Sequence, residues 1–531
     1  MSTTPPPAAR AAAELPDQPT GPTIHDPAER RAVLIAVCIA LMAVIASVTG
    51  LNVAQPELAV EFDASQGEVL WFINLYTLTL AALLLPLGAL GDRWGRKPML
   101  LAGLALFGVA NAAAGMAQTT EAMLGARFLA GVGAAMIMPV TLAVITSTFP
   151  EEERAKGIGA WTAVGGGGGL LGMYISAVLV DLASWRWLFA LPIALVVISV
   201  VMTVRSVPNT REVSAHRFDA VGSSTSVLAV LGLVYALHEG PVHGWTEAAT
   251  LTALVAGLAA TAAFIAWELR QSAPLLDVRL FRDRRLSTGS LAILTVFGVQ
   301  AGILVVLFPF LQVVLGWSAL HATVGMLPMA LVMMFSSVIA AHVAVRAGSR
   351  ATVAAGLLLV SAGLALMAIL VSADGGYLTV LPGMLILGLG MGLAMTPSTE
   401  AITSSLPSDK QGLASALNDV TRELGTAIGV ALLGAVLTAG YRNAIGPELD
   451  GIPDLPDGVA DTAREGLANA SAVAPGLDAQ AAALVRAAQE SFISGWQTAM
   501  WVGAAVMAIM FVYVAALGAT IRSTSMRPDS A

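Results

Sequence analysis

Apolar residues in this chain are gathered into long runs separated by short polar stretches. Many of these runs reach about 20 residues, the length that a helix needs to cross the hydrocarbon core of a bilayer. Because unpaired backbone groups are not tolerated in lipid, runs of this length predict transmembrane helices. Fourteen spans are predicted, near residues 32–53, 67–90, 98–117, 121–148, 156–180, 187–204, 219–237, 248–267, 287–314, 321–345, 351–372, 377–404, 411–440 and 494–521.

Composition supports an all-α membrane protein. The chain has 531 residues, of which 56% are hydrophobic and 12% are charged, whereas a soluble protein carries about 25% charged residues. The net charge of −8 argues against nucleic acid as a partner. Cys38 is the single cysteine and lies within the first span, so a disulfide framework is excluded.

The distribution of lysine and arginine predicts the orientation. If the N-terminus is cytoplasmic, 21 of the 27 basic residues fall in cytoplasmic segments, four fall in external segments, and Arg127 and Arg422 fall within spans. Basic residues in short loops stay on the cytoplasmic side of a membrane. We therefore expect a multi-pass protein of the cell membrane, with both termini in the cytoplasm.

The chain contains an internal repeat. A shift of 257 residues aligns Gly131 with Gly388, and a shift of 253 aligns Gly95 with Gly348. The repeat predicts two pseudo-symmetric six-helix bundles with an inserted helix pair, and a ligand site between the bundles near the membrane midplane. The predicted segments are a disordered cytoplasmic tail at 1–30, an N-terminal bundle at 31–206, an inserted pair with a cytoplasmic linker at 207–286, a C-terminal bundle at 287–522 and a short tail at 523–531.

Two connections are too long to be simple turns. Residues 268–286 form a basic cytoplasmic linker, which is typical of a solvated loop near anionic headgroups. Residues 441–493 form a long external loop with eight acidic residues and three arginines. Its alanine-rich stretch, 479–488, is predicted to form a short helix over the outer mouth.

A short polar turn separates the second and third spans. Its glycines allow a tight backbone, and its acid and three cations cannot lie in hydrocarbon. The turn therefore lies at the membrane surface, on the cytoplasmic side. Its candidate gating residues are Gly88, Asp92, Arg93, Gly95, Arg96 and Lys97.

Charged residues within spans are the main candidates for chemistry, because each costs about 2.5–3.5 kcal/mol at the centre of a bilayer. Spacings of three and four put Asp419, Arg422 and Glu423 on one face of the thirteenth span, and Asp419 lies about 12 Å from the start of that helix. Burial favours a neutral carboxyl group and a nearby arginine favours a charged one, a combination suited to carrying protons. The alternative is a structural ion pair between the halves. Glu400, near the inner end of the twelfth span, is a further candidate for proton coupling.

Polar and aromatic residues within two spans are candidates for a substrate cavity. They are Trp71, Asn74 and Tyr76 on the second span and Gln300, Phe308 and Gln312 on the ninth. Aromatic walls with a few polar groups suit amphiphilic or cationic ligands. The alternative for each aromatic residue is a lipid-facing or interfacial position.

Other familiar sites are not indicated. The glycine run Gly165–Gly169 is not followed by the Gly-Lys-Ser or Gly-Lys-Thr of a phosphate loop, so it favours close helix contact or a bend. The six histidines lack metal-ligand spacing, so neither a metal nor a cofactor is expected. Without a nucleotide motif, an ion gradient is the expected energy source.

Several motifs resemble those of a known transporter family. The turn at 88–97 is similar to the G-x-L-x-D-R-x-G-R-K loop of major facilitator superfamily transporters, and the stretch Arg127–Gly133 resembles their R-x-x-Q-G-x-G motif, with Ala130 in place of glutamine. With its fourteen spans, the chain resembles the fourteen-helix drug:proton antiporters of that superfamily over residues 31–522. The resemblance implies that Asp92 and its cations latch an inner gate against the N-terminus of the thirteenth helix. It also implies that Arg127 tunes the proton affinity of a nearby acid. The alternative for the turn at 88–97 is that it sets the membrane topology alone. The alternative for Arg127 is a buried arginine whose charge is satisfied by carbonyl groups.

The chain departs from this family at two places. Ser47 stands where many members carry an aspartate in the first helix, which gives more weight to Asp419 and Glu423. The stretch Gly172–Ala177 lacks the proline and later glycines of the fifth-helix antiporter motif, so the direction of transport stays open.

The prediction is a monomeric secondary transporter that moves small molecules by rocking its two bundles, exporting amphiphilic drugs or natural products in exchange for protons. The first alternative is a proton-coupled importer or uniporter of a small metabolite. A remote alternative is a membrane sensor or enzyme, although no clustered nucleophile or metal set supports an enzyme.

Overall fold

The computed structural model describes residues 23–517, apart from 52–53, 65, 183, 212–217, 273, 408–409, 454 and 478–479. Within these residues the protein is helical and contains no strand. Of the predicted tails, residues 1–22 and 523–531 lie outside the described residues, and helix α1 begins at Pro27. The expectation of an all-α protein is confirmed.

Fourteen helices of the described part have 20 residues or more, and each corresponds to one predicted span. Thirteen of them are long and apolar enough to cross a membrane; the fourteenth, α6, has 32 residues and occupies the fifth predicted span. The long helices are α1 (Pro27–Gly50), α3 (Gln66–Trp94), α4 (Arg96–Gly115), α5 (Thr120–Thr148), α6 (Glu151–Leu182), α7 (Trp187–Ser206), α8 (Ala220–His243), α9 (Ala248–Glu268), α10 (Arg284–Pro309), α11 (Ala319–Ala347), α12 (Ser349–Leu370), α13 (Tyr377–Thr403), α14 (Gln411–Asp450) and α17 (Ala481–Leu517). The short ones are α2 (Gln55–Glu61), η2 (Val278–Arg282), η3 (Phe310–Val314), α15 (Asp457–Glu465), α16 (Leu467–Val473) and η5 (Ala474–Gly476).

Local sequence explains where several helices begin. Asp26, Thr119, Asp219 and Ser318 each accept a hydrogen bond from a backbone N–H in the first turn of the helix that follows. Such caps satisfy N–H groups that have no partner within the helix. Short polar residues between apolar runs therefore set the starts of α1, α5, α8 and α11.

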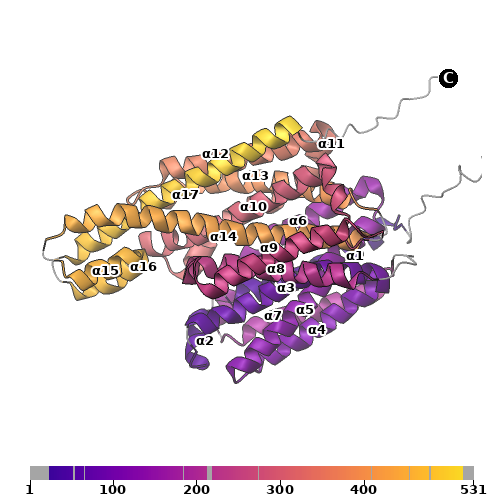
Figure 1. Ribbon diagram of the computed structural model, residues 1–531, viewed down its shortest axis with the longest axis horizontal. Coiled ribbons are helices and arrows are strands. Elements are labelled where there is room, and N and C mark those ends of the chain that lie inside the picture. Colours follow the sequence, from indigo (N-terminus) through magenta and orange to yellow (C-terminus); the bar gives the residue numbers. More distant parts are fainter. Residues whose placement is uncertain are drawn as a thin grey trace, which may run out of the picture.

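The long helices form two bundles and an inserted pair (Figure 1). Helices α1 and α3 to α7 pack together as the N-terminal bundle, and α10 to α14 with α17 pack as the C-terminal bundle. We call the end of the protein at which α1 begins and α17 ends the terminal face, and the other end the outer face. The predicted pair of six-helix bundles is confirmed.

The internal repeat is visible in the helix contacts. A Cβ atom added to Gly131 of α5 would lie 2.8 Å from the carbonyl oxygen of Tyr76, and one added to Gly388 of α13 would lie 2.5 Å from that of Met329. Glycine therefore permits the close approach of α5 to α3 and of α13 to α11. The turns before α4 and α12 also match, because Gly95 and Gly348 both have positive φ, at 108° and 87°.

The two bundles meet on two sides. Helix α6 packs against α11 and α13, and α14 packs against α3 and α5. Near the terminal face, a Cβ added to Gly88 of α3 would lie 2.7 Å from both the carbonyl oxygen of Gly412 and Cβ of Ala416. In this conformation α3 and α14 are therefore in direct backbone contact at the terminal face.

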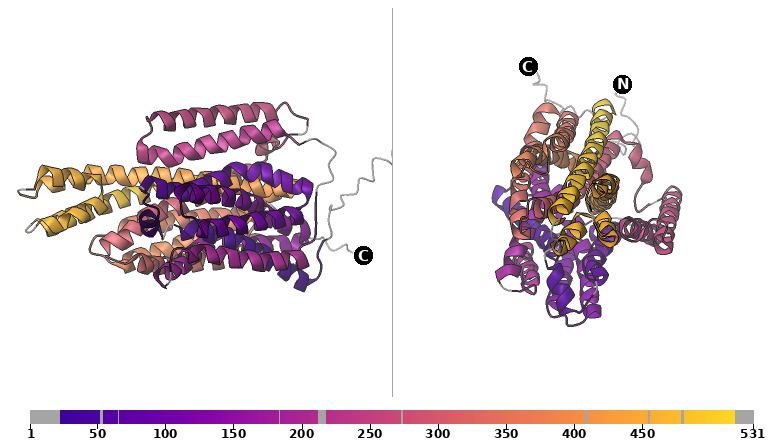
Figure 2. Two further views of the ribbon diagram at one scale, coloured as in Figure 1. Left: turned by 90° about the horizontal axis from the view of Figure 1, so that it is seen from below. Right: turned by 90° about the vertical axis from the view of Figure 1, so that its left-hand side faces the viewer.

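The inserted pair lies on the outside of the bundles (Figure 2). Helices α8 and α9 approach closely at Gly232 and Gly257, and α8 packs against both α3 and α14. The ring of Trp71 on α3 contacts that of Tyr235 on α8, with centroids 5.8 Å apart. Helix α8 thus covers the line where the two bundles meet.

The segment predicted as the external loop is largely helical. Helix α14 continues as one helix of 40 residues to Asp450, and α17 begins at Ala481, so both extend beyond the rest of the outer face (Figure 1). Residues 481–488 of the predicted short helix belong to the first part of α17 rather than to a separate helix over the mouth. Tyr441, Leu467 and Leu484 are buried between these helices and the short α15 and α16, which gives the extension a small core. Burial of these side chains explains why α14 and α17 stay helical beyond the outer ends of the other helices.

Candidate functional site

Asp92 joins the N-terminal bundle to the start of α14. Its Oδ1 accepts a hydrogen bond from the backbone N–H of Gly412 at 2.8 Å, and its Oδ2 accepts one from that of Leu413 at 3.0 Å. A carboxylate at a helix N-terminus satisfies free N–H groups and interacts favourably with the helix dipole. Asp92 is 1% exposed, so water competes little for these bonds.

Basic residues of the same turn hold Asp92 and the neighbouring chain. Arg96 lies 2.7 Å from Oδ1 of Asp92 through Nη2 and donates from Nη1 to the hydroxyl of Thr210 at 3.1 Å. Lys97 donates to the carbonyl of Val204 at 2.8 Å. Arg93 is half-buried. Arg96 thus connects the end of α3 to the segment after α7, and Lys97 connects the start of α4 to the end of α7, while Asp92 reaches across to α14.

Arg127 lies inside the N-terminal bundle and is fully buried. It donates to the carbonyl of Phe72 at 2.8 Å and to the hydroxyl of Ser47 at 3.0 Å, and its guanidinium lies 4.4 Å from the ring centroid of Tyr76. Ser47 in turn donates to Asn111 at 3.0 Å. Among the residues that the structure describes, no carboxylate lies within ion-pair distance of Arg127. Carbonyl, hydroxyl and ring contacts therefore stabilise its charge.

Asp419 and Arg422 form an ion pair in the interior of α14. Nη1 of Arg422 lies 3.4 Å from Oδ1 of Asp419, and both side chains are at least nine-tenths buried. Nη2 of Arg422 donates to the carbonyl of Gly165 in α6 at 3.3 Å. Its guanidinium also lies over the rings of Phe297, at 4.4 Å, and Trp161, at 5.2 Å. Gly165 and Trp161 belong to the other bundle, so Arg422 connects the two halves.

The remaining predicted acids do not join this pair. Glu423 is half-buried beside Arg422, and the described residues include no ion pair between the two. Glu400 is half-buried in the last turn of α13 and is close to Glu151 at the start of α6. The structure therefore places Glu400 near the terminal face and Asp419 deeper in the bundle.

The predicted cavity residues fall into three environments. Gln300 donates from Nε2 to the carbonyl of Gly166 at 3.1 Å and so reaches across the two bundles. Tyr76 is fully buried beneath Arg127, and Trp71 contacts Tyr235 of the inserted helix α8. Asn74, Phe308 and Gln312 are half-buried.

Comparison with known families assigns this fold. The model of the Major Facilitator Superfamily matches residues 37–430. The chain belongs to the major facilitator superfamily. The multidrug resistance protein Stp of Mycobacterium tuberculosis is 31% identical over 90% of this chain and 90% of its own length. The multidrug efflux pump LfrA of Mycolicibacterium smegmatis is 32% identical over 94% of this chain and 97% of its own length.

A solved structure supports the same fold at lower identity. The human organic anion transporter MFSD10 is 15% identical, with a TM-score of 0.60 over 92% of this chain and 100% of that one. The solved structure thus shares the overall fold. The superfamily assignment and the long apolar helices make this facilitator protein a multi-pass membrane protein of a transporter family.

Several residues of this facilitator protein were missed by sequence reasoning. Thr210 binds Arg96 from a segment more than 100 positions away. Glu268, at the end of α9, is fully buried and accepts a hydrogen bond from the N–H of Leu276 at 3.2 Å, close to the α8 cap Asp219. Trp161 and Phe297 surround Arg422. Glu268 could have been noticed in the sequence, because it is a charged residue at the end of a predicted span. The roles of Thr210, Trp161 and Phe297 depend on contacts between helices that are distant in the sequence.

Proposed function

We propose that this protein is a proton-coupled exporter of amphiphilic drugs or natural products that works by alternating access of its two bundles. Support comes from the names of Stp, a multidrug resistance protein, and LfrA, a multidrug efflux pump, which match almost the whole chain. The proposed location is the cell membrane, where the protein acts as a monomer with both termini in the cytoplasm. The terminal face is then the cytoplasmic face, and it is closed in this conformation.

The observation that carries proton coupling is the position of Asp419. It is a fully buried carboxyl group whose partner, Arg422, also binds the backbone of the opposite bundle. Protonation of Asp419 would remove the negative charge that pairs with the guanidinium of Arg422. Loss of this ion pair would change the strength of the hydrogen bond from Arg422 to the carbonyl of Gly165. A proton on one residue thereby alters a contact between the bundles. This is the coupling that an antiporter requires.

The other charged residues have supporting roles in this mechanism. Glu423, on the same helix face, is a second proton carrier or a charge that receives a cationic substrate. Asp92 and Arg96 hold the terminal face closed through the start of α14. Because Ser47 offers no acid to Arg127, Arg127 supplies a fixed positive charge that orders α1, α3 and α5.

Everted membrane vesicles provide the test. With an acid interior, an exporter should move ethidium into the vesicles while protons leave, whereas a proton-coupled importer should move ligand and protons out together. Asp419→Asn should abolish uphill ethidium uptake and its drain on the proton gradient while downhill exchange persists. Asp461→Asn, at an exposed acid of α15, is the matched control. Uphill uptake by Asp419→Asn at the rate of the control would exclude Asp419 as the coupling residue.

A further inference from the structure

A polar cavity lies at the terminal face, between four helices of the C-terminal bundle. Residues from the beginnings of α10 and α12, the last part of α13 and the end of α17 line it, and it has a volume of about 360 Å³ including its open side. Its polar lining residues are Arg285, Thr288, Ser349, Arg350 and Ser398. The described residues that line the cavity include two arginines and no acid, so its charge suits an anion.

Two of the lining side chains have donors to offer. Ser398 is 2% exposed, and its hydroxyl has no hydrogen-bond partner among the residues that the structure describes. Arg285 is exposed, and no carboxylate of the described residues lies within ion-pair distance of it. The carboxylate of Asp283 caps α10 by accepting from the backbone N–H of Arg285 at 2.8 Å. A buried hydroxyl without a partner is costly, so a bound acceptor at this place would stabilise it.

The internal repeat shows what the cavity lacks. Lys97, at the start of α4, donates to the carbonyl of Val204 in the last turn of α7. Arg350 has the equivalent position at the start of α12, and its Nη2 donates to the carbonyl of Ala515 in the last turn of α17. The two bundles therefore join these helix ends in the same way. A guanidinium has five N–H donors, so Arg350 has more to offer than the ammonium of Lys97.

Beyond this shared contact the two copies differ. In the N-terminal bundle the segment after α7 covers the start of α4, where the carbonyl of Thr210 accepts from the backbone N–H of Arg96 at 2.9 Å. In the C-terminal bundle α12 begins at Gly348 without a side-chain cap, and a Cβ added to Gly348 would meet nothing within 4 Å. Within the part of the chain that the structure describes, the start of α12 is therefore open to a ligand.

We propose that this cavity binds the phosphate group of an anionic phospholipid from the leaflet at the terminal face. Arg285 and Arg350 pair with the phosphodiester, and the hydroxyl of Ser398 and the uncapped start of α12 donate hydrogen bonds to its oxygens. The site commits to a lipid because of its surroundings. On α17, Val512 and Leu517 are 60% and 44% exposed, and exposed apolar side chains of a membrane protein face the acyl chains.

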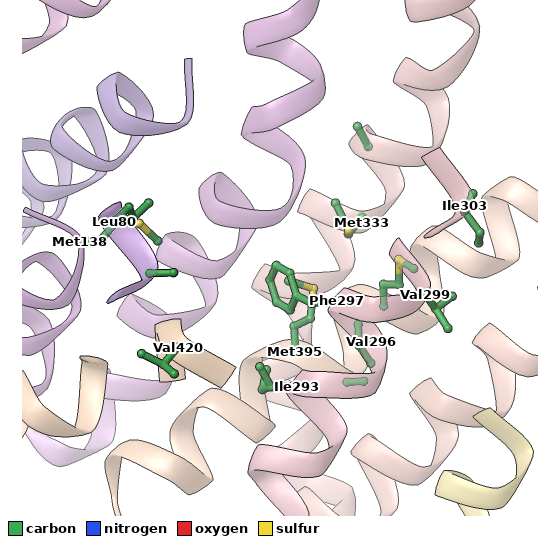
Figure 3. Packing of buried hydrophobic residues seen from close by; sticks show 14 of the residues in the cluster. Leu80, Met138, Ile293, Val296, Phe297, Val299, Ile303, Met333, Met395 and Val420 are labelled. Carbon is green, nitrogen blue, oxygen red and sulfur yellow. The ribbon is translucent and has the colours of Figure 1, made fainter. Parts of the chain in front are cut away.

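The depth of the cavity also suits a headgroup. Its lining residues on α10 end at Gly289, about one turn before the fully buried Ile293. Figure 3 shows Ile293 and Val296 of α10 and Met395 of α13 in the apolar core of this bundle. The polar groups are thus confined to the end of the bundle, at the level where headgroups lie, and the core beneath them is closed to a charged group.

Native mass spectrometry of the purified full-length protein tests the site. The protein is titrated with dioleoylphosphatidylglycerol and, separately, with dioleoylphosphatidylcholine. Arg285→Gln should lower the affinity for phosphatidylglycerol by about fivefold or more and leave that for phosphatidylcholine unchanged. Arg346→Gln is the matched control, because it removes an exposed arginine at the same face that does not line the cavity. Its effect should be less than about twofold.

A second pair of variants tests the buried hydroxyl. Ser398→Ala should lower the affinity for phosphatidylglycerol by about threefold or more. Ser290→Ala is its control, because the hydroxyl of Ser290 is also buried without a described partner but does not line the cavity. Without lipid, both variants should unfold at the midpoint of the wild type or higher, since each loses a buried hydroxyl with no partner. A selective loss of lipid binding in Ser398→Ala is therefore not a failure to fold.

The outcomes decide the proposal without a transport measurement, so they are independent of the proposed export. Phosphatidylglycerol that binds no more tightly than phosphatidylcholine, or equally to all four variants, would overturn the site. Occupation of the cavity by the residues after 517 would give that second result, because added lipid would find the cavity filled. If inorganic phosphate at the same concentration displaces phosphatidylglycerol, the cavity holds a soluble anion and the lipid proposal is wrong.

Discussion

Gly88 provides a direct test of how the terminal face is held closed. A Cβ at this position would lie 2.7 Å from the carbonyl oxygen of Gly412 and from Cβ of Ala416. Ordinary contacts of a Cβ begin at about 3.4 Å, so Gly88→Ala requires α3 and α14 to separate by roughly 0.7 Å. The atoms in the way belong to backbone and to a rigid methyl group, so rotation of a side chain cannot relieve the overlap.

The cost of this overlap falls on the closed conformation. Overpacking of a tight interface costs about 1–3 kcal/mol, and the separation also lengthens the hydrogen bonds from Gly412 and Leu413 to Asp92, which are 2.8 and 3.0 Å long. When the terminal face opens, the methyl group meets no neighbouring helix. We therefore expect Gly88→Ala to raise the ratio of open to closed molecules by about 5- to 150-fold.

Distances between spin labels measure this ratio. Labels at Glu152 of α6 and Arg346 of α11 lie on exposed positions of the two bundles at the terminal face. The native Cys38 is first replaced by serine, so that only the two introduced cysteines react. Gly88→Ala should shift the distance distribution toward longer values in the absence of ligand.

A matched variant separates closure from helix propensity. Alanine stabilises a helix interior by roughly 0.5–1 kcal/mol relative to glycine, and Gly125→Ala makes the same change where no neighbour is contacted. It should leave the distances unchanged. If Gly88→Ala gives the same distance distribution as Gly125→Ala and the same thermal stability, the close approach of α3 and α14 does not hold the terminal face closed.

Three further substitutions test the other contacts. Asp92→Asn removes the charge at the start of α14, which should destabilise the closed terminal face by about 1–2 kcal/mol. The variant should transport more slowly without a change in equilibrium ligand affinity. A variant that differs from the wild type in ligand affinity alone would contradict the role of Asp92 as a latch. Ser47→Ala removes a hydrogen-bond acceptor of Arg127, so the thermal midpoint of unfolding should fall by an amount that corresponds to about 1–3 kcal/mol of stability. Ser224→Ala, at an exposed position, is the control. If the two variants have the same midpoint as the wild type, the hydrogen bonds around Arg127 do not stabilise the bundle. Arg422→Lys keeps a positive charge but cannot donate to both Asp419 and the backbone of the opposite bundle with one planar group. Proton-driven transport by the folded variant should fall at least about tenfold. Full transport activity would show that the contact of Arg422 with Asp419 and Gly165 is not part of the mechanism.

The sequence by itself determined the number and order of the long helices. Fourteen apolar runs correspond to fourteen long helices because a helix that crosses lipid must carry its apolarity and its backbone hydrogen bonds within one continuous segment. The repeat was also readable, since Gly131 and Gly388 recur where the same helix contact recurs in each bundle. Asp92 and Arg127 could also be identified as candidate functional residues from the sequence, because each belongs to a short motif of consecutive residues.

Tertiary structure decided what these residues contact. Asp92 meets N–H groups 320 and 321 positions later in the chain, and Arg422 meets a carbonyl 257 positions earlier, so neither partner could be read from spacing along one helix. The extension of α14 and α17 beyond the outer face was missed because its polar composition resembles a loop, whereas burial between helices stabilises it. Sequence suggested Tyr76 for a cavity wall, and only the packing shows that its ring lies against the guanidinium of Arg127. Spacing identifies which residues share a helix face, but only the packing of distant helices determines what that face meets.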